Sequence, residues 1–333
     1  MCQKPIRFGI LGCGMIAQIH AAAINSLESA ILAGAADQDS FNAIRFSKQY
    51  GITPYSNYSQ MLSDPNIDAV CICTPSGFHA ENAIQALRSK KHVVLEKPMA
   101  TTVADTERII SACQENSRIL TVISQLRFSP ETTLVKNLIS QQAFGTVSFC
   151  NLSMNYWRDP EYYSSSNWKG TQKFDGGGAL MNQGIHGVDL LLYIAGNAKV
   201  LSSRKQTSFH SIEVEDTAAA LLAFENGALG TLSASTCTYP GFDRKIEILG
   251  SSGCAILRDG NLEKLIVNGE TRQDLSRLST VGTAGTPSGL SHHGHILQIS
   301  NFINAIYGKE PLLVDPFQGQ RAVKLIEAIY SNS

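Results

Sequence analysis

The segment IRFGILGCGMIA, residues 6–17, decides the fold of this 333-residue chain. Residues 6–11 predict a strand, and from residue 15 to residue 27 apolar side chains recur at helical spacing. A turn with two glycines, Gly12 and Gly14, lies between them. The segment therefore predicts a strand, a tight turn and a helix, in that order.

Strand and helix signals go on alternating through the first third of the chain. Further strands are predicted at residues 30–36, 69–73, 92–95 and 119–123, and further helices at residues 79–88 and 102–116. The stretch at 69–73 is a nearly continuous apolar run, which is typical of a strand covered on both faces. Strands separated by helices indicate βαβ units, so we predict an α/β domain with a parallel, doubly wound sheet at residues 1–124.

The pattern changes after about Phe128. Strands are predicted at residues 146–156, 217–224, 229–235, 245–249 and 255–257, and turns at Asn226-Gly227, Ser252-Gly253, Asp259-Gly260 and Asn268-Gly269. Such turn pairs suit antiparallel hairpins. We therefore predict a second, α+β domain at residues 125–333, with a large and mostly antiparallel sheet. Helices are expected at 179–195, at 296–307 and at the C-terminus, and a mobile loop at 279–291.

Composition and charge argue against several classes of protein. Hydrophobic residues make up 43% of the chain and charged residues 17%, which argues against wholesale disorder. A net charge of −1 without long runs of one sign argues against nucleic acid or an anionic membrane as the main partner. No stretch approaches the roughly 18 apolar residues that span a bilayer, and no signal peptide precedes the first strand. We expect a soluble, cytoplasmic protein.

The 8 cysteines do not predict a metal site or a disulfide. Cys71 and Cys73 alternate along an apolar run and are expected to be small buried residues, since no second Cys or His pair stands at zinc-like spacing. His292, His293 and His295 end the Ser/Thr/Gly-rich loop without nearby cysteine or carboxylate ligands. We therefore expect no metal.

The glycine turn has the spacing of a dinucleotide site. Gly12 allows the tight turn, Gly14 lets the backbone approach a pyrophosphate, and the small Ala17 lets the helix pack close to the strand. The helix start then offers free N–H groups to the phosphates. Asp37 ends the second strand 20 residues after Ala17, where an acid binds the adenosine ribose hydroxyls and repels a 2′-phosphate. We predict NAD rather than NADP, although Asp37 could also be a helix N-cap or turn residue.

The tripeptide Glu96-Lys97-Pro98 follows the strand predicted at residues 92–95. It lies at the carboxyl edge of the sheet, where open α/β folds bind ligands. A buried lysine can transfer protons or act as a point charge. An ordinary surface lysine in a strand-to-helix turn is an equal alternative from position alone.

The helix predicted at residues 179–195 carries a polar stripe, Asn182, His186, Asp189 and Tyr193. Surface exposure would explain such a stripe. However, Gly184 and Gly187 are costly inside a helix and indicate close approach of backbone or ligand. We therefore favour a functional role for this face.

Four motifs together resemble the Gfo/Idh/MocA oxidoreductases almost end to end. They are Gly12-x-Gly14-x-x-Ala17, Thr74-Pro75-Ser76-x-x-His79, Glu96-Lys97-Pro98 and Gly176-Gly177-Gly178-x-Leu180-x-Asn182-x-Gly184-x-His186-x-x-Asp189. The resemblance implies a Rossmann domain, followed by an open-sheet domain that supplies substrate contacts and the interface of a homodimer or homotetramer. It also implies hydride transfer between a nicotinamide and a secondary alcohol of a sugar, cyclitol or nucleotide-sugar.

The resemblance also implies roles for individual residues. Cofactor contacts are expected from Gly12, Gly14, Met15, Ile16, Ala17, Asp37, Thr74, Pro75, His79, Glu96, Lys97, Gln125 and Trp168. Lys97 and His186 would flank the reacting hydroxyl, and Arg127, Lys169 and Asp189 would lie near the substrate. Trp168 could instead be a core aromatic and Arg127 a surface charge. The Lys97-Pro98 peptide is a candidate for the cis form.

One position departs from the family pattern. Many relatives carry aspartate where this chain has Asn182, whose amide can hold the substrate or orient Lys97 but cannot be a general acid or base. We expect His186 to remove the proton and Lys97 to stabilise the alkoxide, or the reverse division. Two other functions stay open: an enzyme that retains NAD and oxidises a sugar transiently, and a regulator that senses NAD without turnover.

Overall fold

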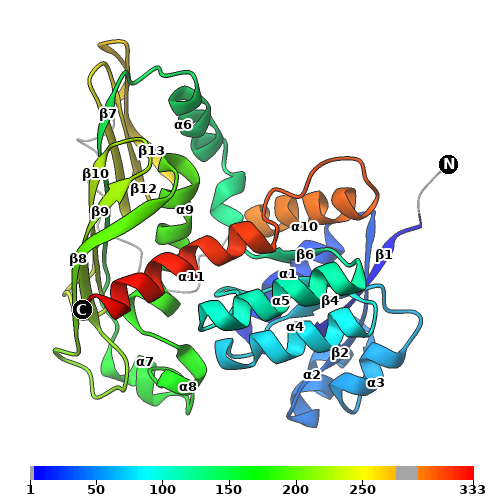
Figure 1. The fold of residues 1–333 in the computed structure, drawn as a ribbon. Helices are drawn as coiled ribbons and strands as arrows, with labels where there is room; N and C mark the ends of the chain where they lie inside the picture. Colours follow the sequence, from blue (N-terminus) through cyan, green and yellow to red (C-terminus); the bar gives the residue numbers. More distant parts are fainter. Residues whose placement is uncertain (1–3, 275–291) are drawn as a thin grey trace. The chain divides into compact units, whose positions relative to one another are not determined.

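A computed structural model describes residues 4–274 and 292–333 (Figure 1). It divides into two compact units, Met1–Gln125 with Leu290–Gln320, and Leu126–Gly289 with Arg321–Ser333. The loop expected at 279–291 lies outside the described residues. The units are defined by packing, so Leu290–Gln320 joins the first unit despite its place in the sequence, and the boundary between residues 124 and 125 stays a prediction. No helix within the described residues is long and apolar enough to cross a membrane.

The first unit is built on a parallel sheet of six strands, called sheet A. Its strands are β1 (Ile6–Leu11), β2 (Ala30–Ala36), β3 (Thr53–Pro54), β4 (Ala69–Ile72), β5 (His92–Leu95) and β6 (Leu120–Val122). The spatial order is β3-β2-β1-β4-β5-β6, and every pair is parallel. The predicted doubly wound sheet is confirmed. The order reverses between β1 and β4, which is the switch point where such sheets bind ligands.

Helices pack on sheet A in βαβ fashion (Figure 1). They are α1 (Met15–Asn25), α2 (Ser40–Tyr50), α3 (Tyr58–Ser63), α4 (His79–Arg88), α5 (Val103–Asn116) and, from late in the chain, α10 (His293–Ile306). The short η1 (Ser76–Phe78) precedes α4. Phe302 of α10 joins the core around Phe8 and Ile10 of β1, with the Phe8 and Phe302 ring centroids 6.2 Å apart. This packing places α10 in the first unit.

The second unit is built on an eight-stranded sheet, called sheet B. Its strands are β7 (Val147–Asn155), β8 (Ala198–Gln206), β9 (Thr217–Phe224), β10 (Leu229–Ser235), β11 (Lys245–Gly250), β12 (Cys254–Arg258), β13 (Asn261–Val267) and β14 (Glu270–Asp274). The order is β14-β13-β12-β11-β7-β10-β9-β8, and only β7 and β10 pair in parallel. The mostly antiparallel sheet is confirmed, and all four predicted turn pairs connect neighbouring strands. The sequence did not reveal β8, β13 and β14, whose many polar residues hide the alternation.

The helices of the second unit pack against sheet B or in its loops. They are η2 (Gln125–Phe128), which starts at the end of the first unit, α6 (Pro130–Ser140), α7 (Pro160–Ser164), α8 (Gln172–Asp175), η3 (Ala179–Gly184), α9 (Ile185–Ala195) and the end of α11 (Pro316–Ser331). Gly187 faces β7 so closely that a Cβ there would lie 2.5 Å from Met154 Sδ. The close approach predicted at this helix is therefore made by its own sheet.

The prediction of one α-helix over 179–195 is wrong in its first half. Residues Ala179–Gly184 form a π-helical turn, in which the Gln183 N–H donates to the Gly178 carbonyl. The carboxylate of Glu215 accepts the N–H groups of Gly178 and Leu180 at 3.0 and 2.9 Å, which holds the start of this turn. π-helical turns of this kind are rare and often lie at functional sites.

Candidate active site

The N-terminus of α1 has the form of an anion site. Gly12 has φ +89°, and a Cβ there would lie 2.7 Å from the Cys73 carbonyl, so only glycine fits. Gly14 precedes the helix with no atom within 4 Å of a Cβ, and no side chain caps the helix start. Ala17 is buried under the turn, while Met15 is exposed. The first N–H groups of α1 therefore face open space, which suits a pyrophosphate.

Asp37 is tied to this glycine turn. Its Oδ2 accepts the Cys13 N–H at 2.6 Å and its Oδ1 accepts the Asp39 N–H at 2.9 Å. The N-cap of α2 is Asp39, whose carboxylate accepts the Phe41 N–H, so the helix-cap alternative for Asp37 is wrong. A half-buried carboxylate beside the turn fits a dinucleotide with free ribose hydroxyls.

His79 ties together the two loops at the carboxyl edge of sheet A. Its ring nitrogens lie 2.8 Å from the Thr74 carbonyl and 2.6 Å from the Pro98 carbonyl. Burial lowers the pKa of His79, although the contacts with these two carbonyls act in the opposite direction and raise it. The Lys97-Pro98 peptide is cis, as predicted. His79 therefore holds the backbone around Thr74, Pro75 and Lys97 in one arrangement.

Glu96 is a buried carboxylate between two histidines. His20 Nε2 lies 2.8 Å from its Oε1, His295 Nε2 lies 3.8 Å from the same oxygen, and Oε2 accepts the Lys97 N–H at 3.1 Å. Burial alone would raise the pKa of Glu96, but the two histidines outweigh it and hold the pKa well below its usual range. The ligand atoms of the three side chains lie within 4.8 Å of one another. The 2.8 Å contact has the length of a charge-assisted hydrogen bond, whereas the ring nitrogens of His295 have no hydrogen-bond partner within the described residues.

Lys97 follows β5 and is half-buried, so a plain surface lysine does not describe it. The backbone around it is held by His79 and Glu96, as above. Gln125, at the start of η2, packs its Cβ against Gly294, and its buried Oε1 has no hydrogen-bond partner within the described residues. The expected cofactor contacts of the first unit thus gather along one edge of sheet A. The expectation that His295 lies without a carboxylate nearby is therefore wrong, and the sequence did not single out His20. Both histidines come from helices far apart in the chain, α1 and α10, so no spacing pattern links them to Glu96.

In the second unit, Asn182 is buried and paired with a carboxylate. Its Nδ2 donates to Asp175 Oδ1 at 2.6 Å, and Asp175 Oδ2 accepts the Gly170 N–H at 2.7 Å. His186 follows at the start of α9 and is half-buried. The sequence pattern did not single out Asp175, because a lone aspartate before three glycines has no diagnostic spacing.

Arg127 and Asp189 bind each other. Two guanidinium nitrogens donate to the two carboxylate oxygens at 2.8 and 2.6 Å, with Arg127 only 1% and Asp189 6% exposed. The Tyr193 ring covers the guanidinium at 4.7 Å. The surface-charge alternative for Arg127 is therefore wrong. Because each charge already has the other as its partner, this pair is suited to anchoring η2 on α9 rather than to binding a substrate.

Trp168 and Lys169 lie in the loop before α8. Trp168 is half-buried, so it is not simply a core aromatic. Lys169 Nζ lies 4.1 Å from the Tyr162 ring centroid and 3.3 Å from the Tyr162 carbonyl. Burial lowers the pKa of Lys169, and Asp175 opposes that change. Lys169 thus joins this loop to α7.

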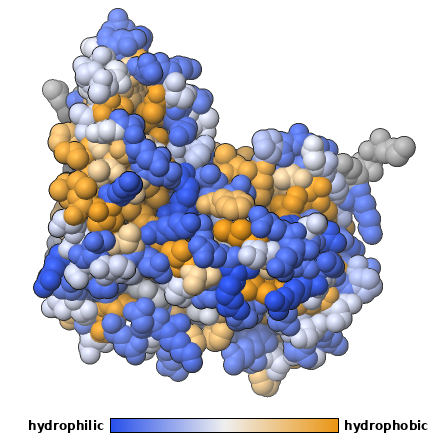
Figure 2. Space-filling model, in the orientation of Figure 1, coloured by the Kyte–Doolittle hydropathy of each residue, from blue (hydrophilic) through white to orange (hydrophobic). Residues whose placement is uncertain are grey.

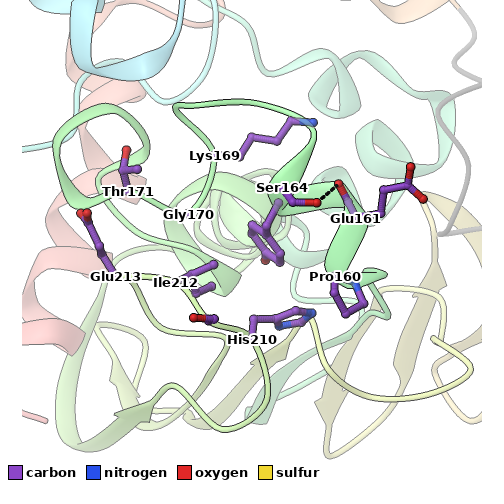
Figure 3. A pocket seen from close by; sticks show the side chains of 11 residues that line it. Pro160, Glu161, Ser164, Lys169, Gly170, Thr171, His210, Ile212 and Glu213 are labelled. Carbon is purple, nitrogen blue, oxygen red and sulfur yellow. Dashed lines mark hydrogen bonds between the residues drawn. The ribbon is translucent and has the colours of Figure 1, made fainter.

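A pocket of about 490 Å³ opens beside this loop (Figure 3). It is lined by Pro160, Glu161, Tyr163, Ser164, Lys169, Gly170, Thr171, His210, Ser211, Ile212 and Glu213. Glu161 and Glu213 make its rim acidic, and the Lys169 ammonium is engaged by Tyr162. Such a lining does not suit an anionic ligand, so we do not assign the pocket to one.

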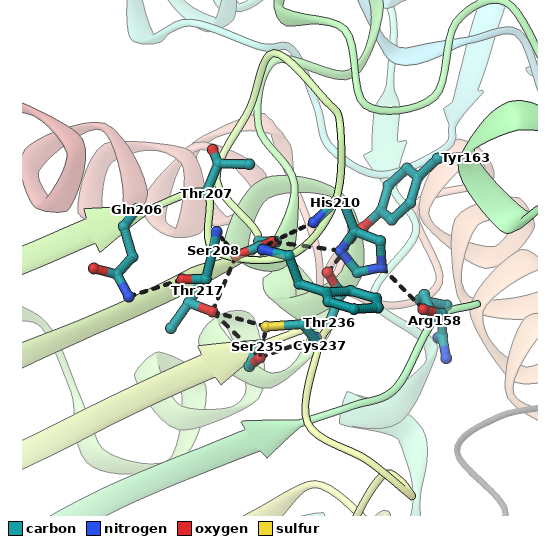
Figure 4. A network of polar contacts seen from close by, with 12 residues as sticks. Arg158, Tyr163, Gln206, Thr207, Ser208, His210, Thr217, Ser235, Thr236 and Cys237 are labelled. Atoms are coloured by element: carbon teal, nitrogen blue, oxygen red, sulfur yellow. Dashed lines mark hydrogen bonds and ion pairs between the residues drawn. The ribbon is translucent and has the colours of Figure 1, made fainter. Parts of the chain in front are cut away.

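Asp216 holds the loop that carries His210, one of the residues lining this pocket, and Figure 4 shows the polar contacts around His210. Its carboxylate accepts the N–H groups of Ser208, Phe209 and His210 at 2.8, 2.8 and 3.0 Å. Burial tends to raise the pKa of Asp216, but these donors and the Thr217 hydroxyl outweigh it and lower the pKa. The loop before β9 is therefore a preformed structure.

Models of two protein domains match this chain. A model described as an oxidoreductase family with an NAD-binding Rossmann fold, Gfo/Idh/MocA, matches residues 6–124. The C-terminal α/β domain of the same family matches residues 136–333. Together the two matches cover most of both units.

Individual dehydrogenases are also similar to this chain. The chain is similar to the WlbA dehydrogenase from Bordetella pertussis, solved in complex with NADH and UDP-GlcNAcA, with 33% identity and a TM-score of 0.88 over 99% of this chain and 96% of that one. It is also 28% identical to myo-inositol 2-dehydrogenase of Thermotoga maritima, covering 79% of this chain and 78% of that protein. With D-glucoside 3-dehydrogenase of Escherichia coli it shares 23% identity over 100% and 97% of the two chains.

Proposed function

The chain belongs to the Gfo/Idh/MocA family of NAD-binding oxidoreductases, and we propose that its substrate is a nucleoside-diphosphate sugar. It is an NAD-dependent oxidoreductase that acts on sugar hydroxyl groups. One observation carries the finer proposal: nearly the whole chain matches, at 33% identity, a dehydrogenase solved with a UDP-sugar. The inositol and glucoside dehydrogenases are less similar in identity or in coverage.

The cofactor would be held by the glycine turn and by Asp37. The open start of α1 would receive the pyrophosphate, and Asp37 would accept hydrogen bonds from the adenosine ribose. The loops carrying Thr74, Pro75 and Glu96 would line the nicotinamide end. When bound, NAD⁺ supplies the acceptor for the hydride that leaves the sugar carbon.

Side chains of the protein remove the proton of the substrate hydroxyl and stabilise the charge that forms. We assign His186 as the base that removes the hydroxyl proton, since an imidazole titrates near neutral pH. Lys97 stabilises the negative charge that develops on the sugar oxygen. Asn182 holds the sugar through hydrogen bonds of its amide.

Self-association of the chain would use sheet B. Phe149, Leu201, Leu221 and Leu229 on its strands are all more than 40% exposed, and Leu229 pairs directly with Phe149. Figure 2 shows apolar side chains gathered over strands β8–β10. Exposed apolar patches of this kind mark interaction surfaces. We propose that this face joins subunits of a homodimer or homotetramer.

We place the protein in the cytoplasm on the basis of its cysteines. All seven cysteines of the described residues are free thiols. Burial raises the pKa of the Cys13 thiol to about 12, which keeps it unreactive. Proteins of oxidising compartments tend to use their cysteines in disulfides instead.

Ligand binding to the NADH-loaded protein tests the substrate class. Isothermal titration should show UDP-GlcNAcA binding at least about 100-fold more tightly than myo-inositol, because the nucleotide adds binding energy remote from the reacting carbon. UDP alone is the control for that contribution. Equal affinity for the inositol and the UDP-sugar would contradict the proposal.

A further inference from the structure

The position of Asn182 in this chain raises a chemical question. Its amide can donate and accept hydrogen bonds but cannot act as a general acid or base. The structure nevertheless contains a carboxylate one hydrogen bond away, since Asp175 Oδ1 lies 2.6 Å from Asn182 Nδ2. Both side chains are buried, with Asp175 0% and Asn182 7% exposed. A buried carboxylate therefore lies directly beside position 182.

Asp175 is itself held in place from several sides. Its Oδ2 accepts the Gly170 N–H at 2.7 Å, and its own N–H donates to the Thr171 carbonyl at 3.0 Å. α8 ends at Asp175 because Gly176 turns into the left-handed region, with φ +73°. The carboxylate has little freedom to rotate or withdraw from Asn182.

A fixed carboxylate determines which way the amide points. An ionised carboxylate only accepts hydrogen bonds, so the nitrogen of Asn182 must face it and the oxygen must face away. The short N–H···O⁻ contact is of the charge-assisted kind, which is stronger than a neutral hydrogen bond. Asn182 thus presents its oxygen in one direction. His186 lies four residues further on, at the next turn of the same helical segment.

We propose that Asp175 is a positioning residue, which orients the Asn182 amide so that its oxygen accepts a hydrogen bond from the sugar next to His186. The inference rests on the proposed function, because it names a residue that supports the same substrate site. Asp175 acts through Asn182 and need not touch the substrate.

Exchanging the two side chains tests this inference. Asp175→Asn should lower kcat about 10- to 100-fold, since a misplaced contact near the reacting group costs up to that much. NADH affinity should stay unchanged. Asn182→Asp should lower kcat further, because it sets two carboxylates face to face. The double variant Asp175→Asn/Asn182→Asp restores one carboxylate and one amide and should recover kcat to within about 10-fold of the wild type.

A second readout does not depend on turnover. In Asn182→Asp, one of two facing carboxylates must be protonated, so its thermal stability relative to the wild type should improve as the pH falls from about 8 to about 5. The double variant should return to the wild-type profile. Asp175 also shifts the pKa values of Tyr162, Tyr163, Lys169 and Tyr330. Arg158, His186 and Glu215 are the other charged or titratable groups around this site, and all seven groups stay in every variant.

The outcomes separate this inference from the proposed function. Asp105→Asn, which removes a carboxylate on α5, is the control and should leave kcat unchanged. Normal kcat in Asp175→Asn, or a double variant no better than Asn182→Asp in kcat and in its pH profile, would overturn the inference. If the wild type turns over no sugar at all, the proposed function fails, while the stability profiles still decide whether Asp175 orients residue 182.

Discussion

Four carboxylates near the expected site accept hydrogen bonds from backbone N–H groups. Asp37 holds Cys13, Glu96 holds Lys97, Asp175 holds Gly170, and Glu215 holds Gly178. Each of these bonds fixes the loop or turn that carries the donor. The loops that would surround cofactor and substrate are therefore shaped by charged side chains.

Asp37 should decide the choice between NAD and NADP. Asp37→Ala removes the acceptor for the ribose hydroxyls, so the affinity for NADH should fall about 10- to 100-fold, as expected for hydrogen bonds to a charged group. The preference over NADPH should shrink, because the repulsion of the 2′-phosphate is lost. Fluorescence titration measures both affinities. Asp39→Ala, which only uncaps α2, is the control. Tighter binding of NADPH than NADH to the wild type would contradict the assignment.

The buried pair of Arg127 and Asp189 should be needed for stability. Arg127→Met leaves Asp189 buried without its partner and should lower the free energy of unfolding by about 3–5 kcal/mol. The double variant Arg127→Met/Asp189→Leu should recover most of this loss. Urea denaturation measures the change. Arg108→Met breaks two exposed ion pairs, one within α5 and one with Glu81 of α4, and should leave the free energy of unfolding nearly unchanged. An equally small effect of Arg127→Met would show that the pair contributes little.

Secondary-structure elements position these residues through their ends. β1, β4 and β5 all end at the same edge of sheet A, and each is followed directly by a loop of the expected cofactor site. In the second unit, the π-helical turn η3 carries Asn182 and passes into α9, which carries His186. The protein therefore places its polar groups where regular elements begin or end, while the interiors of those elements form the core.

His92 at the start of β5 should make the first unit sensitive to acid. Its Nδ1 accepts the Ile119 N–H at 3.1 Å, which requires an unprotonated nitrogen, and burial lowers its pKa to about 4. Because this pKa is below the ordinary value of about 6.5, the contribution of His92 is complete above pH 6.5 and is lost as the pH falls towards 4. Thermal unfolding against pH measures the loss. His92→Asn keeps an acceptor that does not titrate and should show a shallower fall. Identical pH profiles would contradict this role.

How much the sequence could predict depends on the range of the interactions involved. The βαβ order, the glycine turn and Asp37 depend on spacing within short segments, and they could be predicted. Strand β8 and the π-helical turn could not, because neighbours in the fold override the local pattern. The pairs Asp175–Asn182 and His20–Glu96 join separate elements, and no spacing rule links their members. The site could therefore be predicted as a set of residues, but its internal hydrogen bonds could not.

For the whole molecule, the exposed face of sheet B should control assembly. Leu221→Asp places a charge in the apolar patch and should convert the assembly to chains of 36.0 kDa. Leu134→Asp alters an exposed leucine on α6 and is the matched control, which should leave the assembly intact. Sedimentation velocity distinguishes the species. A wild type that sediments as a single chain, or a Leu221→Asp variant that assembles normally, would contradict the proposed interface.

The most direct test of the central claim is the formation of NADH, followed by its near-ultraviolet absorbance with NAD⁺ and UDP-GlcNAcA. We expect the absorbance to rise steadily with the wild type. In Lys97→Met and in His186→Ala, kcat should fall by at least about 100-fold. Both variants should still bind NADH with nearly wild-type affinity. A substrate-dependent rise that persists undiminished in Lys97→Met or in His186→Ala would contradict the account.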